Sequence, residues 1–182
     1  MNVAVQAAPS TTPISDHPIE VKDAGIVILN AYFPTLFKKL GLQKDNQFIS
    51  PAQQTEAVQY LEELATGTTT KDDSLLSLNK VLCGLSVTTS ASTDFTPTSD
   101  QRTVIEGLIS AAIAHWPSIG STTINGFRGN WLVRQGTLVE KSDSWELTVE
   151  RRSYDVLLDR SPYSFSTIKY PWMTKPVHVI WK

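Results

Sequence analysis

Residues Thr137 to Glu150 have the sequence TLVEKSDSWELTVE, and this stretch decides the fold class. Two runs in which apolar and polar residues alternate flank the polar turn Ser142 to Ser144. A period of two places every second side chain on one face, which is typical of two strands joined as a β-hairpin. A lone hairpin is only marginally stable in water, so a further strand or a packed helix is required. We expect Val177 to Trp181 to be that strand and to complete a small antiparallel sheet.

The chain before the hairpin has a helical pattern. Apolar residues recur there at intervals of three and four, which places them on one side of an α-helix. Pro34 should kink or divide the first helix, because proline lacks an amide hydrogen and clashes with the preceding turn. The main helices are expected at residues 23–40, 50–64, 72–82 and 99–116. The sequence therefore predicts an α+β fold, with a mainly helical N-terminal two-thirds followed by a small antiparallel β-sheet.

Two later segments are less regular. A short helix is expected within residues 121–136, although Gly126 and Gly129 weaken the pattern. Residues 155–158 fit either a short helix or a strand.

The domain organisation follows from length and composition. Residues 1–22 are rich in Ala, Ser, Thr and Pro, and almost no large apolar residue follows Val5 before the first helix. We interpret this segment as a flexible tail or linker. Residues 23–182 are long enough for one core, and 41% of all residues are hydrophobic, so we expect a single globular module there.

Charge and hydropathy exclude several partners. The formal net charge is -2, which offers no basic field for nucleic acid. No stretch reaches the roughly 20 apolar residues of a membrane span, so we expect neither nucleic acid nor a membrane as partner. Because Met1 to Val5 does not resemble a secretory signal, synthesis in the cytoplasm is expected. The single cysteine, Cys83, lies in an apolar run and is interpreted as a buried structural thiol.

Candidate catalytic residues are few. The three histidines, His17, His115 and His178, are far apart, and neither a nucleophile elbow nor a phosphate-binding loop is present. Asp155 and Asp159 lie four residues apart and could form an acid/base pair, but the neighbouring arginines make ion pairs the better interpretation. We therefore expect no enzyme activity, no catalytic residue, no cofactor and no metal.

Aromatic residues are concentrated in the second half of the chain. All five tryptophans fall there. The first interpretation is a tryptophan-rich core, and the second is an exposed docking surface, since aromatic residues and Met are enriched at interfaces. The candidate interface residues are Arg128, Trp131, Tyr163, Tyr170, Trp172 and Met173.

Several ordered segments resemble one known family. Residues 23–42 (DAGIVILNAYFPTLFKKLGL) are similar to the opening of the C-terminal module of tape measure proteins of contractile injection systems. Further segments follow in the family's order and carry the resemblance to the end of the chain. They are LATG (64–67), LNKVLCGL (78–85), AHWP (114–117), GFRGNWLVRQG (126–136), WELTVERRSYDVLLDR (145–160), STIKYPWM (166–173) and VHVIW (177–181).

The resemblance implies a structural component of a bacterial phage-tail-like particle, which sets the length of the inner tube or anchors or terminates a tube end. Expected partners are the inner tube, spike, baseplate or cap proteins of the particle, and a homo-oligomer is possible. The family carries no catalytic residues. Its members usually have a long chain before this module, so this chain is expected to be either a fragment of a ruler or a stand-alone relative that anchors, plugs or terminates the tube.

Two other functions remain open at this point. An assembly adaptor or chaperone for tube, cap or cargo proteins would have the same composition and would be absent from finished particles. A small hydrolase using Asp155 and Asp159 is the third hypothesis, and it requires turnover that depends on those two carboxylates.

Overall fold

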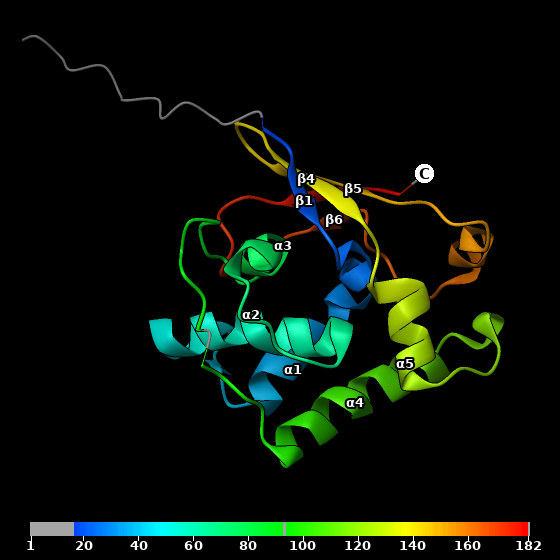
Figure 1. Ribbon diagram of the computed structural model, residues 1–182, viewed down its shortest axis with the longest axis horizontal. Coiled ribbons are helices and arrows are strands. Elements are labelled where there is room, and N and C mark those ends of the chain that lie inside the picture. Colours follow the sequence, from blue (N-terminus) through cyan, green and yellow to red (C-terminus); the bar gives the residue numbers. More distant parts are fainter. Residues whose placement is uncertain (1–16, 93, 182) are drawn as a thin grey trace, which may run out of the picture.

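The computed structural model describes residues 17–92 and 94–181, which form a five-stranded sheet with helices packed beneath it (Figure 1). The strands are β1 (Ile19–Val21), β4 (Gly136–Glu140), β5 (Trp145–Val149), β6 (Thr167–Ile168) and β7 (Val177–Trp181), in the spatial order β1-β4-β5-β7-β6. A separate antiparallel pair consists of β2 (Gln43–Lys44) and β3 (Gln47–Phe48). The α+β fold class is confirmed.

The predicted hairpin is present, but the sheet is mixed and not wholly antiparallel. β4 and β5 pair antiparallel with Leu138 opposite Leu147. β7 pairs with β5 in the parallel direction, and β6 then pairs antiparallel with β7. Parallel neighbours need a long crossover, and residues 150–176 supply it. The expectation of an antiparallel third strand was wrong because the periodicity of a strand does not contain its direction.

The N-terminal edge of the sheet corrects the expected boundary at residue 22. Ile19–Val21 forms β1 and pairs antiparallel with β4, so that Ile19 lies opposite Leu138. Val21 is buried against the helices. A three-residue strand is too short to produce a periodic signal, so the sequence did not reveal it. The remainder of the expected tail, residues 1–16, lies outside the described residues.

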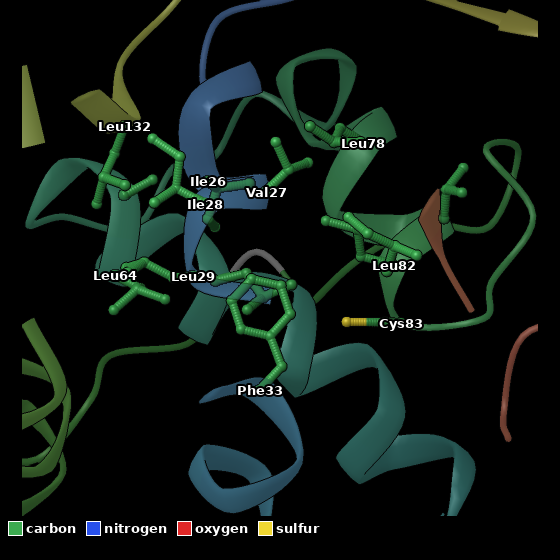
Figure 2. Close-up of a cluster of buried hydrophobic side chains, with 14 of the residues drawn as sticks. Ile26, Val27, Ile28, Leu29, Phe33, Leu64, Leu78, Leu82, Cys83 and Leu132 are labelled. Carbon is green, nitrogen blue, oxygen red and sulfur yellow. The ribbon is translucent and has the colours of Figure 1, made fainter. Parts of the chain in front are cut away.

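A buried 3-10 helix, η1 (Ala24–Tyr32), occupies the centre of the molecule. Every residue from Ala24 to Leu29 is buried, whereas an amphipathic helix would leave one side exposed. In Figure 2 Ile26, Val27, Ile28 and Leu29 lie among side chains from the surrounding elements. Gly25 allows this close packing, because a Cβ atom there would lie 1.7 Å from the carbonyl oxygen of Trp131.

Pro34 divides the first helical segment, as predicted. The chain changes from η1 to the α-helix α1 (Phe33–Lys39), and Pro34 lies in the first turn of α1. A proline fits there because the first amides of a helix have no partner within the helix.

The other expected helices are confirmed with small changes in their bounds. α2 (Pro51–Thr66) begins after Ser50, whose hydroxyl accepts a hydrogen bond from the amide of Gln53. The segment predicted at residues 72–82 is a 3-10 turn, η2 (Asp73–Leu76), followed by α3 (Ser77–Leu82). α4 (Ser99–Ala114) begins with a capping box made by Thr98 and Gln101.

The irregular segments are short helices. They are η3 (Pro117–Ile119), α5 (Ile124–Phe127), the π-helical turn η4 (Arg128–Leu132) and η5 (Asp155–Arg160). η5 decides in favour of a helix at residues 155–158, where the sequence left the choice open.

Candidate interaction site

The segment Tyr170–Met173 lies in the core and joins the sheet to the helices. Trp172 is 8% exposed, and its indole nitrogen donates a hydrogen bond to the carbonyl oxygen of Leu82, at 2.9 Å. Its ring stacks on that of Tyr170 with 4.5 Å between the centroids. Met173 is 4% exposed. The aromatic and thioether surfaces of these residues are therefore covered by the same chain.

Trp172 also explains why the loop after α3 contains Gly84. The backbone at Gly84 has a φ of +75°, and a Cβ atom there would lie 2.1 Å from the carbonyl oxygen of Trp172. The conformation and the close approach both require glycine.

Arg128 stabilises the C-terminal end of α2. Its guanidinium donates hydrogen bonds to the carbonyl oxygens of Glu63 and Leu64, at 3.2 and 3.1 Å, and to the side chain of Asn125. The last carbonyl groups of a helix have no partner within the helix and carry partial negative charge, which a cation stabilises. Arg128 is therefore buried and bonded within the fold, and its guanidinium is not displayed on the surface.

Trp131 and Tyr163 belong to a second aromatic group around Trp116. The ring centroids of Trp131 and Trp116 are 4.6 Å apart. Trp131 is 3% exposed. Tyr163 is half-buried, and its hydroxyl donates to the carbonyl oxygen of Ala112 at 2.6 Å. It also lies 3.3 Å from the hydroxyl of Tyr32.

The structure thus places the six candidate interface residues mainly inside the molecule. Arg128, Trp131, Tyr170, Trp172 and Met173 are buried, and only Tyr163 has a substantial exposed fraction. Their burial agrees with the interpretation as a tryptophan-rich core, so their possible docking role stays a prediction that would require a change of conformation.

Asp155 forms a buried ion pair with Arg134, a residue that the sequence analysis did not single out. Two guanidinium nitrogens of Arg134 contact the two carboxylate oxygens at 2.9 and 2.7 Å. The carboxylate also accepts hydrogen bonds from the backbone amide of Arg152 and from the indole N–H of Trp181, both at 2.9 Å. Ion pairs with the neighbouring arginines were expected, yet the residue that pairs with Asp155 is 21 positions away in the sequence.

Aromatic rings enclose the Arg134 guanidinium. Its central carbon lies 5.1 Å from the ring centroid of Trp181, 5.3 Å from Tyr154 and 5.4 Å from Trp131. Cation–π attraction is stronger when the cation is desolvated, and the Arg134 side chain is fully buried. The Arg134 centre, meaning Arg134, Asp155, Trp131, Tyr154 and Trp181, therefore ties η4 to η5 and β7.

The two candidate catalytic carboxylates, Asp155 and Asp159, have different environments. Burial opposes ionisation of Asp155, but hydrogen bonds from Arg134, the Arg152 amide and Trp181 more than compensate and lower its pKa. An acid that must exchange a proton near neutral pH needs a raised pKa and a free oxygen, so this geometry does not favour hydrolysis. Asp159 is exposed to solvent.

A second acidic cluster has the opposite character. Asp23, just before η1, and Glu62 of α2 are 2% and 8% exposed, and Asn79 of α3 lies with them. Neither oxygen of Asp23 accepts a hydrogen bond of normal geometry from the described residues. Burial raises the pKa of Asp23 to about 6, and burial together with the charge of Asp23 raises the pKa of Glu62 to about 8.

Cys83 is a free, buried thiol, as predicted. Burial raises its pKa well above the usual value, so it is a poor nucleophile at neutral pH. Figure 2 shows it near Leu82 at the edge of the hydrophobic cluster.

An open groove of about 510 Å³ runs between α1 and α4. Most of its lining is apolar or small. The residues include Tyr32 of η1, Leu36 and Lys39 of α1, and Val104, Gly107 and Ala111 of α4.

Comparison with known proteins decides the family. The family model described as contractile injection system tape measure protein matches residues 2–181. The chain belongs to this family. No curated protein and no solved structure matches it.

The family match confirms the resemblance that the ordered sequence segments indicated. Tape measure proteins are structural and do not form an enzyme class, which agrees with the Arg134 centre being a partnered ion pair. Within residues 17–92 and 94–181 no three His, Cys, Asp or Glu side chains cluster as metal ligands would. In the same residues no helix of this tape measure protein has the length and hydrophobicity needed to cross a membrane.

Proposed function

We propose that this tape measure module anchors or terminates one end of the inner tube of a contractile injection particle. The family match over residues 2–181 carries the proposal. The partners are then the tube, spike, baseplate or cap proteins at that end, and the module is made in the cytoplasm before it is incorporated.

The fold supports an end position over an extended one. A ruler must follow the tube over its whole length, whereas the longest described helices, α2 and α4, have 16 residues each. At a rise of 1.5 Å per residue, each spans roughly 24 Å. The strands of the sheet also come from both ends of the described chain, because β1 lies beside β4 and β7 beside β5. Extending the chain would therefore break the sheet and expose the core.

Deletion of this protein from its source cell tests the proposal. The expected result is loss of particles or a broad distribution of tube lengths in electron micrographs. Normal particles of uniform length would contradict an assembly role. Re-expression with a label before residue 17 then locates the protein, and a label at one end of each particle is expected. A label along the whole tube would contradict the anchor.

Two matched variants separate folding from function in the same strain. Asp159→Asn changes an exposed carboxylate and should restore particles fully. Trp172→Ala removes a buried ring and should fail to restore them, because truncating a buried tryptophan costs roughly 3–5 kcal/mol. An adaptor or chaperone is distinguished by purification, since it would be absent from finished particles.

A further inference from the structure

Two carboxylates from different parts of the chain are buried, and no cation among the described residues forms an ion pair with either of them. Asp23 lies between β1 and η1, and Glu62 lies on α2. The side-chain amide of Asn79, which is fully buried, donates to Glu62 at 3.5 Å, near the limit of a hydrogen bond. Both oxygens of Asp23 and the amide oxygen of Asn79 have no hydrogen-bond partner among the described residues. A cluster of buried acceptors therefore lacks at least one donor.

The charged groups on the surrounding elements are engaged elsewhere. Lys80 of α3 is bonded to Asp73 of η2 at 2.6 Å. Glu63 of α2 pairs with Arg102 of α4. The remaining neighbours are used in the contacts described above or face solvent. Arg128 is hydrogen-bonded to the C-terminal end of α2, and Arg134 is paired with Asp155. Glu20 and Lys22, which are close to Asp23 in the sequence, are exposed.

A proton is the missing donor that fits this arrangement best. A carboxylic acid donates one hydrogen bond, and the unpartnered amide oxygen of Asn79 is an acceptor in this cluster. Protonation also removes one of two like charges from a low-dielectric environment, where both cannot readily be ionised. We propose that Asp23 and Glu62 together hold one proton at neutral pH and, with Asn79, form a latch that holds β1 and the start of η1 against α2 and α3.

The latch opens when this proton is lost to water. Two negative charges then remain in the core, and their repulsion acts between the N-terminal strand and the helices. Because the pKa of Glu62 is raised from 4.5 to about 8, its contribution to stability is complete below about pH 4.5. The contribution decreases as the pH rises from there to about 8. The pKa of Asp23, raised to about 6, acts in the same direction.

The test compares the whole protein with Glu62→Gln, which keeps the shape of the side chain and cannot ionise. The unfolding constant of the original protein should increase by at least ~10-fold between about pH 6 and pH 9, and that of Glu62→Gln should change much less. Glu106→Gln is the control, because Glu106 is exposed on α4 and should leave the pH dependence unchanged. Equal pH dependence in the original protein and in Glu62→Gln would overturn the proposal.

Two further measurements keep the conclusion independent of one variant. Infrared spectra at neutral pH should contain a carboxylic acid band that disappears in Glu62→Gln and in Asp23→Asn. Hydrogen exchange, corrected for its intrinsic pH dependence, should show β1 losing protection above about pH 8 only in the original protein. Absence of the acid band would overturn the proposed proton. Stabilisation by Mg²⁺ or Ca²⁺ at alkaline pH that Glu62→Gln removes would overturn it as well, in favour of a cation.

Discussion

The Arg134 centre and the latch are two buried acidic sites with opposite consequences for stability. Asp155 accepts four hydrogen bonds, two of them from a guanidinium. Asp23 accepts none of normal geometry and lies near a second carboxylate. Burial is similar in both, since Asp155 is 8% and Asp23 is 2% exposed. The partners of a buried carboxylate, and not its burial, therefore decide whether its charged form stabilises the fold.

Removing the cation from the partnered site should have the largest effect. Arg134→Met leaves Asp155 buried without its ion pair, and breaking such a pair costs about 3–5 kcal/mol. Urea unfolding at neutral pH measures the loss. Arg160→Met, which changes an exposed arginine at the end of η5, is the matched control and should stay within about 0.5 kcal/mol. A small effect of Arg134→Met would mean that Asp155 is satisfied without it.

Removing one neutral donor should weaken the same site less. Trp181→Phe keeps an aromatic ring near Arg134 but deletes the indole N–H that donates to Asp155. A hydrogen bond to a charged group contributes roughly 1.5–3 kcal/mol, so a loss near the lower end is expected while three donors remain. The pKa of Asp155 should rise toward its usual value, and acid unfolding should begin at higher pH. Unchanged acid stability would show that this bond is unimportant.

Neutralising the unpartnered site should have the opposite sign. Asp23→Asn removes one of the two like charges and should increase the free energy of unfolding at about pH 8 by about 1 kcal/mol or more. The gain should vanish below about pH 4, because the carboxyl groups are then neutral in both proteins. Thermal unfolding at the two pH values measures it. Destabilisation at pH 8 would place the charged form of Asp23 among the stabilising groups.

The smallest effect is expected at the exposed neighbour of Asp155. Asp159→Asn should change stability by less than about 0.5 kcal/mol, because surface substitutions without buried partners rarely do more. Denaturant unfolding checks the stability, and particle assembly checks the function. A large loss of assembly in a stable variant would reassign Asp159 to a binding role.

The sequence predicted features that depend on neighbouring residues. The starts of the helices near residues 50 and 99, the break at Pro34 and the hairpin across Ser142–Ser144 all follow from backbone preferences within a few positions. The family resemblance was likewise recognisable from the ordered sequence segments alone. The role of Arg134 could have been suspected only from its place in the segment at residues 126–136, which was quoted for the family resemblance and not for an ion pair.

What the sequence determined by itself is the family, the α+β class and the position of most helices and strands, because these depend on composition, periodicity and local turn chemistry. Tertiary structure alone decided the parallel pairing of β7, the entry of β1 into the sheet, the burial of the aromatic candidates and the partners of Asp155 and Asp23. Each of these joins residues far apart in the chain. Their free energies depend on desolvation and on which group faces which, and neither is determined until the elements have packed.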